Sequence, residues 1–217
     1  MQGKPDFNAG ERQAFGLLLP GPSHPDLRRL KKQHRPSRHG HKIWNATWIL
    51  LDYLRRQEPP RGVRVLDVGC GWGLAGIFCA RFFRARVTAI DVDPQVFPFL
   101  ELHARLNQVE IRTGQASFDE IPLELLKRHD QLIGADICFD DGMIDPLCRL
   151  VERAVRARID RIVLADPGRP SFRRLVSRCA RQLGGVEQAW TTEEPLLSWP
   201  AGRPKIRGRL LLVPSSA

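Results

Sequence analysis

Two carboxylates and a run of alternating glycines are the residues whose types and spacing best fit a binding site. Asp67 is followed by glycine at positions 69, 71 and 73, and Asp91 lies 18 residues after Gly73. Glycine lets a backbone turn at positive φ and approach a ligand closely, because it has no Cβ. A glycine turn before a helix, with an acidic residue beyond it, is typical of sites that hold a nucleoside and its ribose hydroxyls.

The charge of Asp67 favours one kind of nucleoside ligand over another. Residues 71–76 also match the dinucleotide pattern G-x-G-x-x-G, which is a weak signal alone. That pattern begins three residues after the expected strand ends at Val68. A carboxylate at the strand tip would also repel a pyrophosphate in a low-dielectric cleft. S-adenosylmethionine instead offers an ammonium group to Asp67 and a ribose to Asp91, so we expect that cofactor.

Alternating strands and helices are expected to position these residues. Two short β-branched strands, 63–68 and 87–91, flank an apolar helix over 74–83. Further strands are expected at 109–112, 131–139, 160–165, 186–191 and 206–213, and helices at 42–57, 94–106, 143–156 and 171–183. The alternation predicts an α/β fold in which residues 43–217 form a doubly wound, mostly parallel, Rossmann-like sheet of seven strands. Ligands of such sheets bind beyond the carboxyl ends of the strands, where five polar residues are expected: Asp67, Asp91, Gln115, Asp136 and Asp166.

The glycine run and Asp91 resemble motifs I and II of the class I (seven-stranded) S-adenosylmethionine-dependent methyltransferases. In the second half, Gly134-Ala-Asp-Ile-Cys-Phe-Asp-Asp141 and Leu164-Ala-Asp-Pro-Gly-Arg-Pro170 are similar to the protein-lysine methyltransferase group that modifies the electron-transfer flavoprotein β subunit. The similarity covers about residues 42–175. It departs from that group at Phe139, where tyrosine is usual, and in the segment 43–47, which lacks a proline.

The resemblance implies roles for individual residues. Asp136 and Asp140 are expected to bind and orient a substrate amine in catalysis, and Phe139, Asp141 and Arg169 to contact the substrate. Helix capping by the Asp140–Asp141 pair and bracing of its own loop by Arg169 are the structural alternatives. Cofactor binding is expected from Trp44, Asp67, Gly69, Cys70, Gly71, Gly73, Asp91, Val92, Gln115, Ala116 and Asp136.

Methyl transfer to lysine requires loss of a proton, which costs roughly 4–5 kcal/mol at pH 7 from a pKa near 10.4. A water path or local desolvation must lower this cost, and the sequence does not show which. An RNA or small-molecule methyltransferase is the alternative to a protein-lysine enzyme. A third alternative is a binding module that holds the cofactor without catalysis.

Basic residues are concentrated near the start of the chain. Residues 1–42 hold nine Lys and Arg against three Asp and Glu, so +6 of the net +10 lies there. We expect this segment to be a basic N-terminal helical extension, with residues 1–22 loosely ordered apart from an apolar patch at 14–19, and a short helix capped by Ser23. Such a segment could follow RNA phosphates, contact an acidic protein or simply be a solvated face.

Composition bounds the remaining expectations. Five cysteines with no C-x-x-C pair indicate reduced thiols and a cytoplasmic protein. No apolar run approaches the ~20 residues of a membrane span, and no signal peptide is evident. The histidines at 34, 39 and 41 match no zinc spacing, so no metal is expected. We therefore expect a monomer whose partner is a protein substrate, with RNA as the alternative.

Overall fold

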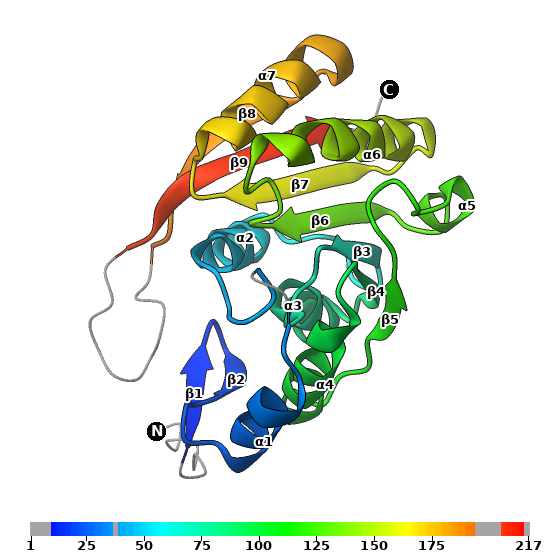
Figure 1. The fold of residues 1–217 in the computed structure, drawn as a ribbon. Helices are drawn as coiled ribbons and strands as arrows, with labels where there is room; N and C mark the ends of the chain where they lie inside the picture. Colours follow the sequence, from blue (N-terminus) through cyan, green and yellow to red (C-terminus); the bar gives the residue numbers. More distant parts are fainter. Residues whose placement is uncertain (1–9, 37–38, 194–204, 215–217) are drawn as a thin grey trace.

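A seven-stranded sheet forms the centre of the molecule. The computed structural model describes residues 10–36, 39–193 and 205–214. The strand order is β5-β4-β3-β6-β7-β9-β8, and β9 runs in the direction opposite to the other six strands of this sheet (Figure 1). This confirms the expected mostly parallel α/β sheet. The strands are β3 (Arg64–Val68), β4 (Arg86–Asp91), β5 (Arg112–Gln115), β6 (Gln131–Ala135), β7 (Arg161–Asp166), β8 (Val186–Thr191) and β9 (Arg207–Pro214).

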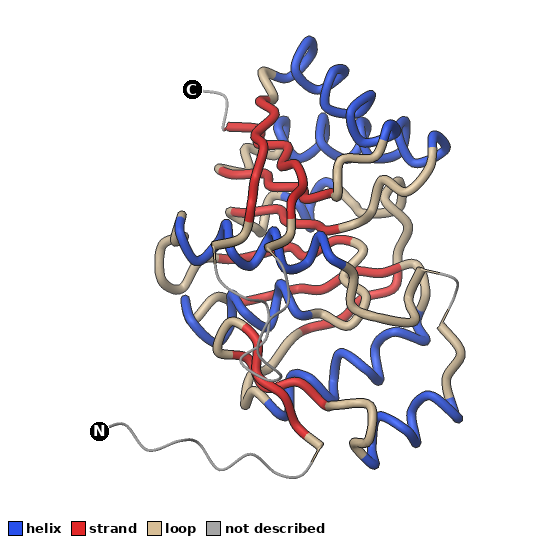
Figure 2. The backbone as a smooth tube through the Cα atoms, turned by 90° about the vertical axis from the view of Figure 1, so that its left-hand side faces the viewer, coloured by secondary structure: helices blue, strands red, loops and turns tan. Residues whose placement is uncertain are grey.

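Helices cover both faces of this sheet (Figure 2). One face packs against α2 (Asn45–Arg56), α3 (Leu74–Phe83) and α4 (Phe97–Leu106), and the other against α5 (Leu123–Leu126), α6 (Ile144–Arg156) and α7 (Pro170–Leu183). A separate hydrophobic core lies on each face of the sheet. Strand β3 contributes to both, because Val65 packs into the core under α2, α3 and α4, whereas Leu66 and Val68 pack into the core under α5, α6 and α7. Short 3₁₀ turns, η1 (Pro94–Val96) and η2 (Asp141–Met143), precede α4 and α6. Within the described ranges, none of the helices is long and apolar enough to cross a membrane.

The start of the described chain is more ordered than its composition indicates. β1 (Glu11–Ala14) and β2 (Leu17–Pro20) form a hairpin whose turn residues Phe15 and Gly16 both have positive φ, so order extends beyond the apolar patch at 14–19 into residues expected to be loose. The Asn107 side chain at the end of α4 donates to the Leu18 carbonyl and accepts from its N–H, both at 2.9 Å. Residues 1–9, for which loose order was also expected, lie outside the described part.

The first helix differs from expectation in its cap. Helix α1 (Pro25–Gln33) follows the hairpin and lies beside α4 (Figure 1). Its N-cap residue is His24 rather than Ser23, and no side chain caps it. The boundary at residue 42 between a basic extension and the main domain stays a prediction.

Two strands near the site also differ from their expected bounds. Strand β5 begins at Arg112, where 109–112 was expected to be the whole strand. Strand β6 ends at Ala135, although a strand was expected over 131–139. The backbone leaves the strand because Asp136 adopts φ 65°, a left-handed conformation that turns the chain.

Candidate functional site

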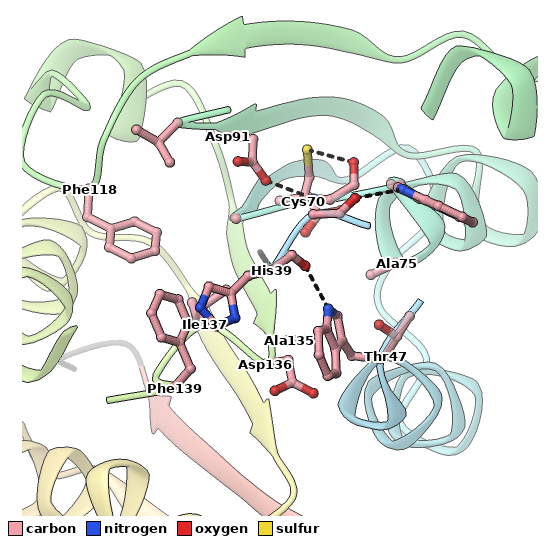
Figure 3. A pocket seen from close by; sticks show the side chains of 18 of the residues that line it. His39, Thr47, Cys70, Ala75, Asp91, Phe118, Ala135, Asp136, Ile137 and Phe139 are labelled. Carbon is pink, nitrogen blue, oxygen red and sulfur yellow. Dashed lines mark hydrogen bonds between the residues drawn. The ribbon is translucent and has the colours of Figure 1, made fainter. Parts of the chain in front are cut away.

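A cavity of about 350 Å³ lies at the carboxyl ends of the central strands (Figure 3). Its volume falls in the range of small-molecule sites. The walls come from the glycine turn after β3, the ends of β4 and β6, the loop after β5, the start of α2 and the segment before it. The site therefore lies where the sheet topology places it.

The glycine turn forms a cradle that a larger residue could not make. Gly69, Gly71 and Gly73 all have positive φ. A Cβ on Gly73 would lie 2.4 Å from Leu100 Cγ, so that glycine is also required for packing. A Cβ on Gly71 would meet nothing within 4 Å, and this residue lines the cavity. Its backbone is thus open to close approach by a ligand.

Asp67 is a buried carboxyl group on the wall of the cavity. It is only 2% exposed, and its Oδ2 accepts a hydrogen bond of 3.0 Å from the Gly76 backbone N–H in the first turns of α3. Burial raises its pKa to about 7, and the nearby charge of Asp91 adds to the rise. The hydrogen bond from Gly76 opposes both effects.

Asp91 ties the second motif to the first. Its two oxygens accept hydrogen bonds from the Gly71 N–H at 2.9 Å and the Asp93 N–H at 3.0 Å. Burial raises its pKa despite these bonds. The carboxylate at the end of β4 therefore fixes the glycine turn while it faces the cavity.

Asp136 shares one arginine with a second carboxylate. Arg169 forms ion pairs with Asp136 and with Asp166, whose side chain is fully buried. Asp166 also accepts from the Gly168 and Arg169 backbone N–H groups at 2.7 and 2.8 Å. Burial raises the pKa of Asp136, and Arg169 opposes that rise. Asp136 and Arg169 line the cavity and Asp166 lies behind them, so this group of three has a formal charge of −1 when both carboxylates are ionised.

The segment before α2 closes the cavity on the side facing β6. The Trp44 Nε1–H donates to the His39 carbonyl at 2.7 Å, and the Trp72 Nε1–H donates to the Gly40 carbonyl at 2.9 Å. The His39 ring stacks on Phe139 with 3.9 Å between ring centroids and 14° between planes (Figure 3). Two indoles and one aromatic stack thus hold this segment, which we call the strap (residues 39–42), across the site.

Most of the predicted site residues lie together around this cavity. Asp136, Phe139 and Arg169 line it, with these predicted cofactor residues: Trp44, Asp67, Gly69, Cys70, Gly71, Gly73, Asp91, Val92 and Ala116. Three others do not reach it. Gln115 is exposed and donates to the Val92 carbonyl at 3.3 Å, Asp140 is exposed, and Asp141 forms an ion pair with Arg174 on α7. The contacts of Arg169 are its ion pairs with Asp136 and Asp166, as expected if this residue braces its own loop.

Sequence reasoning missed the apolar end of the cavity. Phe118 comes from the loop after β5, Met143 from η2, Pro146 from α6 and His39 from the strap. No local pattern marks these residues, because each joins the cavity through contacts with distant elements. Trp72 could have been predicted, since a large aromatic side chain between two glycines of a tight turn must pack against the residues around that turn.

The residues present fit S-adenosylmethionine. Asp67 and Asp91 both line the cavity beside an open glycine backbone, which suits an ammonium group and ribose hydroxyls and opposes a pyrophosphate. The fold and this site define a class I S-adenosylmethionine-dependent methyltransferase.

Comparison with known proteins defines the family. The family model described as "Lysine methyltransferase" matches residues 25–170. The chain therefore belongs to the lysine methyltransferase family. It is 31% identical over 146 residues to the electron transfer flavoprotein beta subunit lysine methyltransferase of Xenopus laevis, which covers 62% of this chain and 56% of that protein. It is also 37% identical over 76 residues to the ubiquinone biosynthesis O-methyltransferase of Xanthomonas axonopodis, which covers 35% of this chain and 31% of that protein.

Solved structures agree on the fold. A 16S rRNA N2 G1207 methyltransferase of Thermus thermophilus, in complex with AdoMet and guanosine, has a TM-score of 0.63 at 20% identity, covering 96% of this chain and 50% of that chain. A precorrin-6y C5,15-methyltransferase of Geobacter metallireducens has a TM-score of 0.59 at 14% identity, and the match covers 85% of this chain and 95% of that chain. This chain spans between about a third and three fifths of the length of the curated relatives that it matches.

Proposed function

We propose that this chain transfers a methyl group from S-adenosylmethionine to a lysine side chain of a protein substrate. The observation that carries the proposal is the substrate end of the cavity, where two carboxylates share one guanidinium and aromatic rings form the wall. A net negative charge favours a cationic side chain, and apolar rings suit the methylene stem of lysine. Membership of the lysine methyltransferase family supports the same substrate.

Each residue then has a proposed role. Asp67 binds the ammonium group of the cofactor and Asp91 its ribose, while the turn from Gly69 to Gly73 lets the ligand lie against the backbone. Ala116 and Val92 contact the adenine. The bound cofactor supplies an activated methyl group. The protein contributes mainly orientation, an effect worth up to ~7–11 kcal/mol.

Asp136 orients the substrate amine in this proposal, with Arg169 as the positioning residue that holds it. Phe139 contacts the substrate stem. Asp140 and Asp141 lie outside the cavity, so a role for them requires contact with the substrate beyond its lysine. A cytoplasmic location is part of the same proposal, since all five cysteines are free.

A small-molecule methyltransferase is the second candidate. The 37% identity to a ubiquinone biosynthesis O-methyltransferase and the apolar wall formed by Phe118, Phe139 and Met143 favour it. Transfer to RNA is the remaining alternative, with the basic residues before Lys42 as the phosphate-binding surface.

The test uses radiolabelled S-adenosylmethionine and a lysate of the cells that make the protein. Wild type and Asp136→Ala are compared, with and without nuclease, at 50 and 200 mM salt. A labelled protein band that resists nuclease, yields methyllysine on hydrolysis and disappears with Asp136→Ala supports the proposal. Calorimetry with S-adenosylhomocysteine should show that the variant still binds cofactor. Label confined to RNA, or to molecules extracted by organic solvent, contradicts it and supports one of the alternatives.

A further inference from the structure

The proposed lysine reaction requires a proton acceptor, and the carboxylates of the cavity are already engaged. Asp136 is held by Arg169, and Asp67 and Asp91 accept backbone N–H groups of the motif loops. Asp119 forms two hydrogen bonds with Arg149, at 2.9 and 2.7 Å. Asp140 is exposed and is absent from the wall of the cavity. Each of these carboxylates therefore already has a partner or lies outside the cavity, which leaves the role of proton acceptor to another group.

His39 is differently placed. Its ring lines the cavity, packed face to face on Phe139, and its backbone carbonyl is held by Trp44. Within the part of the chain that the structure describes, no hydrogen bond occupies its ring nitrogens. Imidazole is the side chain whose ordinary charge change falls nearest to neutral pH, which suits a proton acceptor.

The geometry points to His39 as the general base that deprotonates the substrate amine, an inference that rests on the proposed lysine function. An N–H bond of the substrate ammonium breaks and its proton moves to a ring nitrogen of His39. The freed electron pair then forms the N–C bond as the C–S bond of the cofactor breaks, leaving S-adenosylhomocysteine. The imidazolium returns its proton to solvent.

The surroundings of His39 are consistent with this role. The stack on Phe139 fixes the ring plane, and a phenylalanine at that position adds no competing hydroxyl group. Other charged or titratable groups face the same cavity from its own segment, the motif loops, the loop after β5, β6 and the turn before α7: Lys42, Asp67, Cys70, Asp91, Asp119, Asp136 and Arg169.

The test measures how His39→Gln changes the rate of labelling of the protein band over pH 6–9. We expect a loss of about 100-fold or more at pH 7, the lower range for general acid–base catalysis. The loss should shrink by about tenfold for each pH unit, since the neutral fraction of a free lysine amine rises tenfold per unit below its pKa. Binding of S-adenosylhomocysteine, measured by calorimetry, should stay within about threefold of wild type, which shows that the site is folded.

Chemical rescue separates a base from a packing residue. His39→Ala leaves a space beside Phe139, and added imidazole should restore labelling, whereas pyrazole, with the same shape but far weaker basicity, should not. His34→Gln is the control, because His34 lies at the end of α1, outside the strap, and does not line the cavity. It should label at the wild-type rate.

The possible failures are distinguishable. Wild type that labels no protein overturns the lysine function and the role of His39 with it. If wild type labels a protein, a loss in His39→Gln that is constant across pH, or equal rescue by imidazole and pyrazole, overturns only the role of His39. Wild-type activity in His39→Gln also overturns it.

Discussion

Asp67 makes the predicted affinity for cofactor depend on pH. Burial raises its pKa to about 7 in the free protein, so about half of the molecules carry a proton there at pH 7. An ammonium group beside the carboxylate binds its ionised form. The protonated fraction falls from about nine-tenths at pH 6 to one-tenth at pH 8, so the affinity should rise by about tenfold over this interval.

Calorimetry with S-adenosylhomocysteine at pH 6, 7 and 8 measures this change. Repeating the titration at pH 7 in buffers of different ionisation enthalpy should show release of about half a proton per ligand bound. Asp67→Asn keeps the shape of the side chain but cannot ionise. It should bind more weakly at pH 8 and show no rise in affinity between pH 6 and pH 8.

The stability of the free protein provides a second measurement with the opposite dependence. Because the pKa of Asp67 is higher in the folded state than in the unfolded chain, the folded state binds more protons between about pH 4 and 7. This contribution is full at low pH and is lost as pH rises to 7. From pH 5 to pH 8, wild type should lose about 3 kcal/mol of unfolding free energy relative to Asp67→Asn.

Urea unfolding at the two pH values tests this difference. The exposed Asp160 lies at the other end of the sheet, before β7, and Asp160→Asn should behave like wild type in both measurements. Equal pH dependence in wild type and Asp67→Asn, in binding and in stability, would refute the reasoning.

Three further changes test the surroundings of the site by urea unfolding. Burial lowers the pKa of His103 to about 4, so wild type should lose about 2 kcal/mol between pH 8 and pH 5 relative to His103→Phe, because the unfolded chain takes up the proton first. Equal slopes would contradict this. Gly73→Ala should destabilise the protein by more than Gly62→Ala. The two glycines have similar positive φ, but a Cβ at position 62 meets open space, so that change costs only the ~1–2 kcal/mol of backbone strain, whereas a Cβ at position 73 also clashes with Leu100. Only the change at Gly73 should weaken S-adenosylhomocysteine binding. Arg169→Gln should cost about 3 kcal/mol by leaving two carboxylates without their cation, and the added change Asp136→Asn should recover part of it.

The part of the site predicted from the sequence is the part built from neighbouring residues. Between Asp67 and Asp91 the chain forms one strand, one tight turn, one helix and a second strand. The turn demands glycine at three positions with positive φ, and the strands demand apolar residues on both faces. Both requirements can be recognised from the residue types alone. The cofactor class and the parallel sheet could therefore be predicted.

The hairpin before α1 shows the opposite case. Its two-residue turn places Phe15 at φ 50°, a conformation for which asparagine or glycine is the usual signal. The hairpin is stabilised by contacts that local sequence does not reveal, with Leu17 and Leu19 buried against the rest of the chain and Asn107 bonded to Leu18. Tertiary packing overrode a weak local pattern, so a composition rich in glycine and proline was misleading for the residues on either side of the apolar patch at 14–19.

The strap follows the same physics, which explains why its place in the cavity could not be predicted from the sequence. Trp72 bonds to Gly40 across 32 positions, and His39 stacks on Phe139 across 100. Neither contact needs an unusual residue type at either end, because an indole N–H can donate to any carbonyl and aromatic rings also pack in ordinary cores. The cavity thus has one half built from neighbouring residues of the motif and another half built from contacts between distant segments. Substitutions in the strap should therefore change substrate turnover while leaving cofactor affinity nearly constant, and those in the glycine turn should change both.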